Sequence, residues 1–112
     1  MKRIDAVIRP DKLDAIKASL HDLGITGLTI VEARGFGRQK GHTETYRGTE
    51  YSLDFLPKLF LTLFVDDELL EPALAAIIDG ARTGQIGDGK IVVTSLDEVI
   101  RIRTGERGRV AI

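Results

Sequence analysis

Two short stretches near the C-terminal end of the chain carry residues whose types and spacing suit phosphate binding. The first begins at Gly84 and ends with Gly89 and Lys90. It matches the P-loop pattern except that Ile91 stands where a P-loop has a magnesium-binding hydroxyl. Free backbone N–H groups beside an ammonium group can still bind an anion. A tight glycine turn with Lys90 in solvent is the alternative, and the pattern alone leaves both open.

The second stretch contains Arg101 and Arg103, which alternate with Ile100 and Ile102. This alternation predicts a strand, and residues two apart on a strand leave the same face about 7 Å apart. Two guanidinium groups at that spacing suit a polyphosphate. They could equally line a solvated strand edge, where positive charge discourages aggregation.

A long polar stretch, residues 33–57, shows no secondary-structure period. We expect a loop over residues 37–55, and loops of this length in compact domains are usually functional or disordered. Tyr46 and Tyr51 favour a partner-binding or modified loop, because a tyrosine ring supplies contact area and its hydroxyl a polar handle. A flexible hairpin tip is the alternative. At the base of the loop lies a third polar cluster, formed by Arg38, Gln39 and Lys40.

The first half of the chain has strand and helix patterns that would position these stretches. Residues 3–9 alternate between apolar and polar, which predicts a strand that buries Ile4, Ala6 and Ile8. Pro10 favours a helix start, and apolar residues at spacings of three and four continue the helix to Gly24. A second strand is expected at residues 25–36.

The second half repeats this order. Residues 58–65 are apolar on nearly both faces, which predicts a strand at the centre of a sheet or at a subunit interface. An acidic turn leads into a helix that is expected to bury Leu74, Ile77, Ile78 and Ala81, and its first residue is left open because Pro72 should lie in the first turn. A strand at residues 91–95 follows, and the chain beyond Gly105 is expected to fray. The order βαββαβ predicts an α+β ferredoxin-like fold, with both helices on one face of an antiparallel sheet.

Composition narrows the class of protein further. The chain has 112 residues and a formal net charge of −1, which predicts one domain without the basic excess of a nucleic-acid-binding protein. It has no cysteine, so disulfides and thiolate metal sites are excluded. No signal-peptide pattern and no apolar run of about 20 residues is present, so we expect a cytoplasmic protein.

Two other kinds of chemistry receive little support from the sequence. The run from Arg34 to Gly37 matches the start of an RNA-recognition signature, but the alternating aromatic residues that stack on bases do not follow. The two histidines, His21 and His42, have no carboxylate or hydroxyl at a spacing that would build a hydrolytic site. Any magnesium would arrive with phosphates, since no cluster of protein ligands is evident.

Three segments carry longer motifs, at residues 34–51, 83–90 and 99–106. In this collinear order the segments resemble the PII nitrogen-regulatory signalling proteins, and the last two are similar to the B-loop and the C-terminal loop of that family. The resemblance implies one domain over residues 1–112. It also implies a partner-binding loop at 37–55, a phosphate-binding loop at 82–90 and a C-terminal loop at 98–112.

The resemblance implies a homotrimer that binds ATP or ADP in each cleft between subunits. One subunit would contribute Gly35, Gly37, Arg38, Gly87, Gly89 and Lys90, and its neighbour Thr29, Arg101 and Arg103. Asp88 belongs to the implied nucleotide-binding residues as well.

The resemblance also implies a second effector, 2-oxoglutarate, which chelates the Mg²⁺ ion of bound ATP. Gln39 would complete the magnesium coordination, Lys58 would pair with the distal carboxylate, and Lys40 and Gly41 would complete the site. The long loop would then change its conformation and control ammonium transporters or nitrogen-metabolism enzymes. Tyr51 resembles the tyrosine that a nucleotidylyltransferase modifies in part of the family.

Three residues depart from the usual pattern of the family. Phe60 and Thr62 stand where many relatives have charged residues, and Val92 replaces an aromatic residue. Thr62 is expected near the nucleotide base, whereas Phe60 could strengthen the trimer core.

We weigh a non-enzymatic sensor against two other classes. A small ATP-dependent enzyme on the same fold would also use the glycine-rich loop and the two arginines. A metal- or metabolite-binding relative without nucleotide would lack those features, and this chain has both.

Overall fold

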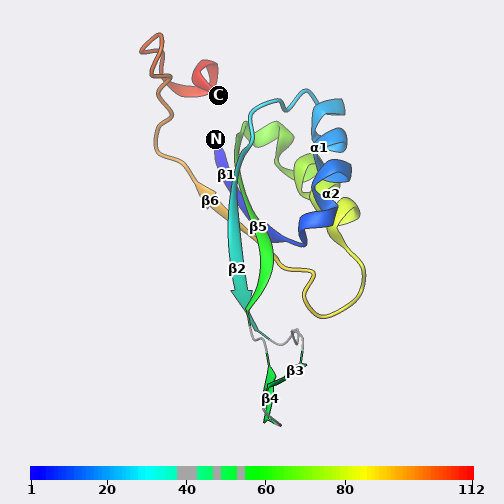
Figure 1. The fold of residues 1–112 in the computed structure, drawn as a ribbon. Coiled ribbons are helices and arrows are strands. Elements are labelled where there is room, and N and C mark those ends of the chain that lie inside the picture. Colours follow the sequence, from blue (N-terminus) through cyan, green and yellow to red (C-terminus); the bar gives the residue numbers. More distant parts are fainter. Residues whose placement is uncertain (38–42, 47–48, 53–54) are drawn as a thin grey trace.

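Four strands form one antiparallel sheet, and two helices cover one of its faces (Figure 1). This computed structural model describes residues 1–37, 43–46, 49–52 and 55–112. The sheet order is β2-β5-β1-β6, built from Thr29–Phe36, Phe55–Val65, Lys2–Ile8 and Lys90–Ser95. The helices are α1, Leu13–Asp22, and α2, Leu70–Ala81. The predicted ferredoxin-like fold is confirmed, and β5 takes the predicted central position.

The core lies between the sheet and the helices, where one face of each strand meets one side of each helix. The strands contribute the predicted Ile4, Ala6 and Ile8 together with Leu61, Leu63 and Val65, and the helices contribute Ile16, Leu20, Ala73, Ile77 and Ala81. Ile78, which was expected in the core, is instead exposed, because α2 turns the neighbouring Ile77 inward. Ala73 was missed, since a small residue adds little to the apolar pattern.

The helix ends follow the expected local chemistry. A 3-10 turn at Pro10–Lys12 precedes α1. Gly24 follows α1 with φ +82°, a conformation that glycine adopts without strain, and its N–H donates to the His21 carbonyl (2.8 Å). Pro72 lies in the first turn of α2, as predicted, where its missing N–H costs no helix hydrogen bond.

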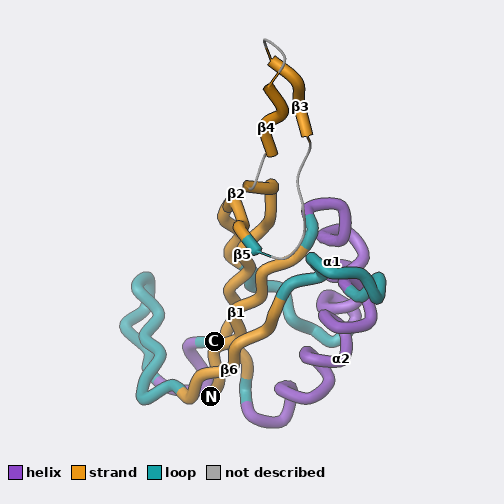
Figure 2. The backbone as a smooth tube through the Cα atoms, turned by 90° about the horizontal axis from the view of Figure 1, so that it is seen from below, coloured by secondary structure: helices purple, strands orange, loops and turns teal. Residues whose placement is uncertain are grey.

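The strand boundaries differ from the sequence prediction at both ends of the long loop. β2 begins at Thr29 rather than at residue 25, and β5 begins at Phe55 rather than at residue 58. The loop itself was expected to lack secondary structure, but β3, Thr43–Tyr46, pairs with β4, Thr49–Ser52. Tyr46 and Tyr51 therefore lie in strands. The two strands form a separate sheet beyond β2 and β5 (Figures 1 and 2).

The C-terminal arm, residues 96–112, also differs from its prediction. Arg101 and Arg103 do not lie on a strand: Ile100 forms an isolated bridge with Arg107, and residues 102–104 form a turn. The chain after Gly105 is not frayed, since a 3-10 turn forms at Gly108–Ala111. The arm lies near the N-terminus, at the end of the sheet away from β3 and β4 (Figures 1 and 2).

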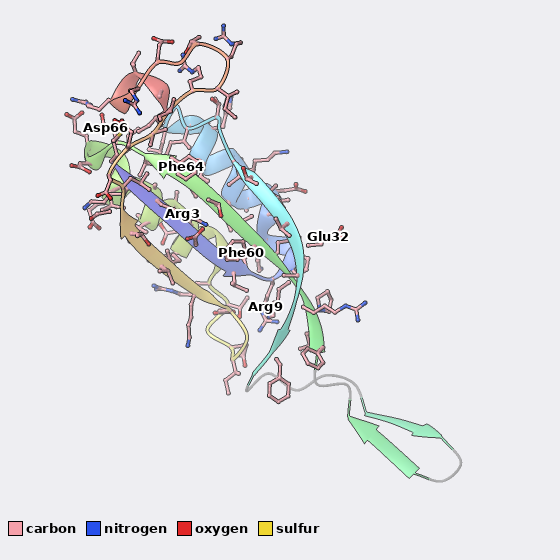
Figure 3. The ribbon with its side chains drawn as sticks, turned by 90° about the vertical axis from the view of Figure 1, so that its left-hand side faces the viewer. Arg3, Arg9, Glu32, Phe60, Phe64 and Asp66 are labelled. Atoms are coloured by element: carbon pink, nitrogen blue, oxygen red, sulfur yellow. The ribbon has the colours of Figure 1, made fainter. Side chains whose placement is uncertain are left out.

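The face of the sheet that no helix covers carries apolar side chains around the polar side chains of Arg3, Asp5 and Thr62. Phe60 and Phe64 of β5 point to this side together with Arg3 (Figure 3). Val31 and Val92 add apolar surface with exposed fractions of 53% and 57%. The uncovered face is therefore unusually apolar for a surface. Among the residues that the structure describes, no helix has the length and apolar character needed to span a bilayer.

Candidate functional site

The glycine-rich loop, residues 82–90, connects the C-terminal end of α2 to the start of β6, in the order that the sequence predicted. Gly84, Gly87 and Gly89 all have positive φ. Gly89 has a second constraint, because a Cβ atom built there would lie 1.7 Å from the Val7 carbonyl oxygen. This glycine therefore allows the loop to pack against β1.

Asp88 stabilises the conformation of the loop through hydrogen bonds to other residues of the loop. Its carboxylate accepts hydrogen bonds from the N–H groups of Thr83 (2.8 Å) and Gly84 (2.9 Å) and from the Thr83 hydroxyl. The hydrogen bonds from Thr83 hold the pKa of the Asp88 carboxyl well below its usual range. Asp88 is thus a structural residue of the loop in this state, and its negative charge does not attract phosphate.

Two cations from neighbouring segments hold the loop at successive carbonyl groups. Arg9 donates from Nη2 to the Ile86 carbonyl (2.8 Å) and from Nε to Asp88 (3.3 Å). Lys58 donates from Nζ to the Gly87 carbonyl (2.7 Å). In a planar trans peptide the C=O group and the following N–H group point in opposite directions. The N–H groups of Gly87 and Asp88 therefore point away from the two cations.

The Gly87 N–H forms no hydrogen bond with the described residues, whereas the Asp88 N–H lies at the end of the turn formed by Ile86 and Gly87. The Gly87 N–H and Lys90, at the start of β6, are the groups that the predicted anion-binding arrangement would use. Arg9 was missed by the sequence reasoning as a residue of this site. A sequence signal existed, because Arg9 directly follows β1, the strand that pairs with the strand after the loop.

Lys58 links this loop to the end of β2. Its side chain is 8% exposed and lies against Gly35, where an added Cβ atom would be 3.1 Å from the Lys58 Cγ atom. Burial lowers the pKa of the Lys58 ammonium, and the charge of Arg9 lowers that pKa further, whereas Asp88 raises it. A buried ammonium group flanked by a second cation is suited to receive a carboxylate.

The structure thus brings most of the first predicted group together at one end of the sheet. The described members of this group lie together with Lys58, which was predicted for the 2-oxoglutarate site. We call Gly35, Lys58, Gly87, Asp88, Gly89 and Lys90 the loop-end cluster, and Gly37 follows directly after β2. Arg38, Gln39, Lys40 and Gly41 lie outside the described residues, as does His42.

The second predicted group, Thr29, Arg101 and Arg103, lies toward the opposite end. Thr29 begins β2 and lies six positions before Gly35, which corresponds to about 20 Å along the strand. Arg101 and Arg103 belong to the arm, which starts where the Leu96 N–H donates to the Met1 carbonyl (3.1 Å). A single chain therefore does not bring the two predicted groups into one site.

A cleft of about 400 Å³ lies beside Thr29. Its lining includes Gly27, Thr62 and Phe64 of the chain's body and Arg109 of the arm. The Thr62 hydroxyl donates to the Asp5 carboxylate (2.6 Å), which also accepts from Arg3 (2.9 Å). Thr62 is therefore paired within the uncovered face of the sheet.

The described residues include no group of three or more His, Cys, Asp or Glu side chains that could hold a metal ion. His21 is exposed on α1, as expected for a solvated helix residue.

Comparison with known proteins agrees with the motifs. The family model described as Nitrogen regulatory protein P-II matches residues 1–106. Proteins named Nitrogen regulatory protein P-II from Azospirillum brasilense, Rhodospirillum rubrum and Haemophilus influenzae are each 59% identical over 112 residues, which cover the whole of both chains. These relatives are named as regulatory proteins, in agreement with the prediction that the chain is not an enzyme. The chain belongs to the P-II family and is a nitrogen-signalling regulator.

Proposed function

We propose that this protein is a cytoplasmic homotrimer that senses ATP or ADP and, with Mg-ATP, 2-oxoglutarate. The observation that carries the proposal is the separation of the predicted nucleotide residues into two groups at opposite ends of one sheet. Residues that cannot meet within one chain can meet across an interface between two. The loop-end cluster of one subunit would bind phosphate together with Arg101 and Arg103 of its neighbour.

The uncovered face of the sheet supports the trimer. Phe60, Phe64, Val31 and Val92 form a surface whose burial between subunits would be favourable, at about 25 cal/mol for each Å². Phe60 replaces a charged residue of the family pattern, so it would add to this contact. The Arg3–Asp5–Thr62 group would enter the interface with its hydrogen bonds already made.

Lys58 supports the second effector, 2-oxoglutarate. Its buried ammonium group is suited to a carboxylate, and Gln39, Lys40 and Gly41 follow the last residues of β2 in the sequence. Because the described residues offer no protein cage for a metal, Mg²⁺ would be held by the ATP phosphates, by 2-oxoglutarate and by Gln39.

The output of the sensor would be the segment from residue 37 to residue 55. Its proposed partners are an ammonium transporter or enzymes of nitrogen metabolism. Tyr51, in β4, would be the residue that a nucleotidylyltransferase modifies.

The test is calorimetric titration with Mg-ATP, repeated with saturating 2-oxoglutarate, together with the mass of the particle from light scattering. We expect a trimer and tighter ATP binding in the presence of the acid, because two ligands that share a site are thermodynamically coupled. A monomer, or ATP binding that is indifferent to 2-oxoglutarate, would contradict the proposal.

A further inference from the structure

The C-terminal arm is a closed hairpin whose two sides are hydrogen-bonded to each other. The Arg101 N–H donates to the Glu106 carbonyl (2.9 Å), and the Gly105 N–H donates to the Arg101 carbonyl (2.7 Å). Farther down, the Gly108 N–H donates to the Val99 carbonyl (2.9 Å). The backbone thus places Arg101 and Glu106 opposite each other.

The Arg101 guanidinium is engaged by this hairpin. Its Nη1 atom donates to the Glu106 carboxylate (3.0 Å), and its Nη2 atom donates to the Val110 carbonyl (2.7 Å). The backbone bonds place the two residues opposite each other, which favours this ion pair, although both side chains are partly exposed and water screens the pair. Glu106 therefore offsets the positive charge of Arg101.

Arg103 is in a different state, although it lies only two residues away. Its exposed side chain forms no hydrogen bond or ion pair with the described residues. Carboxylate and phosphate oxygens use the same guanidinium donors. An anion would meet an unopposed charge at Arg103 but a carboxylate already in place at Arg101.

We propose that Glu106 sets the affinity of this site for phosphate by competing for the Arg101 guanidinium. The inference rests on the proposed function, in which Arg101 binds nucleotide phosphate. Phosphate must displace the Glu106 carboxylate or bind beside it against its repulsion. Glu106 thus restricts the site to ligands with enough charge to overcome that opposition. Glu106 acts through Arg101 and need not contact the base or sugar.

The alternative to competition is a positioning role, in which Glu106 holds Arg101 in the orientation that phosphate requires. The two roles predict opposite signs when the charge of Glu106 is removed. Competition predicts tighter binding, whereas positioning predicts weaker binding.

The test is titration of the full-length protein with ATP, comparing Glu106→Gln with the wild type. We expect E106Q to bind ATP about twofold to fivefold more tightly, the upper part of the range of a released, partly exposed ion pair. Glu98→Gln is the matched control, since it removes the same charge from the arm and the Glu98 carboxylate lies 4.0 Å from Arg107 rather than near Arg101. We expect E98Q to change the affinity less than about twofold.

Two further comparisons make the result specific to Arg101. The gain from E106Q should vanish in an Arg101→Gln background, and it should be absent when adenosine, which has no phosphate, replaces ATP. Glu106→Asp keeps the charge but shortens its reach, so it should give a smaller gain than E106Q and serves if E106Q unfolds the arm.

The outcomes separate this inference from the proposed function. If the wild type binds ATP and E106Q binds it equally or more weakly, the inference is wrong and the proposed function stands. An equal gain in E98Q would also overturn it, because the effect would then be one of general charge. If neither the wild type nor E106Q binds ATP, the proposed function and the inference are wrong together.

Discussion

The loop at residues 82–90 and the C-terminal arm both carry cations that were predicted to bind phosphate, but they are held in different ways. The loop is fixed from outside, by Arg9 and Lys58, which reach its carbonyl groups from other segments. The arm is fixed mainly by its own hairpin bonds, and its polar contacts with the body come from Arg109 and Leu96.

The loop and the arm therefore differ in how their binding groups are arranged before a ligand binds. The loop directs the Gly87 N–H outward without rearrangement, so it would be preorganised for the proposed anion. The arm holds the Arg101 guanidinium against the Glu106 carboxylate, so a phosphate group would have to replace that hydrogen bond with its own. In a two-subunit site, the loop would provide a rigid wall and the neighbour's arm a part that adjusts on binding.

The largest effect is expected from Gly89→Ala, which tests how tightly the loop packs. The new Cβ atom would meet the Val7 carbonyl at 1.7 Å, and φ is +100°, so the loop or β1 must shift. We expect a loss of about 3 kcal/mol or more in the free energy of unfolding, measured by urea denaturation. Gly84→Ala is the control: φ is +85° but nothing lies within 4 Å, so a loss of about 1 kcal/mol is expected. Equal losses would mean that the loop is not tightly packed against β1 at Gly89.

The next effect tests the role of Arg9 in directing the loop N–H groups. Arg9→Met removes the bonds to Ile86 and Asp88, so the Gly87 peptide should reorient and ATP affinity should fall about tenfold. Arg9→Lys should restore only part of the affinity, because an ammonium lacks the planar fork that reaches two acceptors. The amide resonances of Gly87 and Asp88 should move in the ligand-free R9M protein.

Arg82→Gln is the matched control for R9M. It removes the same charge at the first residue of the loop, and the Arg82 side chain forms no hydrogen bond or ion pair with the described residues. If R82Q weakens ATP binding as much as R9M, then Arg9 acts through its charge alone.

The comparison also explains how much of the molecule the sequence could predict. Ile4, Ala6 and Ile8 show the period of their strand directly, and Pro10 and Gly24 mark the ends of the first helical segment. Such signals are local, so the fold followed from them. Ile78 was misplaced because its apolar character fits the helix pattern, whereas its burial depends on which side of α2 faces the sheet.

The site was predicted less completely, because its contacts join segments far apart in the chain. The glycine pattern indicated an anion-binding loop, but the bond from Arg9 to the Ile86 carbonyl depends on tertiary structure. The alternation around Arg101 predicted a strand, yet the hairpin to Glu106 satisfied the backbone instead. Alternation cannot distinguish a strand from an arm that folds back on itself.

A smaller effect is expected from Asp88→Asn, and it depends on pH. The fold lowers the pKa of Asp88, so its carboxylate stabilises the protein above the unfolded-state pKa of about 3.9. That stabilisation is lost as the pH falls toward the folded-state pKa. The wild type should therefore exceed D88N in stability at pH 6, and the difference should shrink between about pH 4 and pH 2. A difference that stays constant over this range, measured by urea denaturation, would show that the charge of Asp88 does not hold the loop.

The smallest effect on stability is expected from Arg109→Gln, a substitution in the C-terminal arm. Arg109 donates to Asp66 (2.6 Å), but its side chain is 66% exposed, so the pair is screened by water. We expect the urea denaturation curve to stay within error of the wild type, because the arm's own bonds remain.

Local opening of the arm should still respond to this change. Hydrogen exchange at the Gly108 and Ile112 amides should accelerate about twofold to fivefold, since one of the arm's ties to the body is lost. Arg107→Gln is the control, because Arg107 approaches Glu98 only to 4.0 Å and should leave exchange unchanged. If R109Q lowered the stability of the whole protein, the arm would be an integral part of the fold. The contrast between a fixed loop and an adjustable arm would then fail, because both halves would be held from outside.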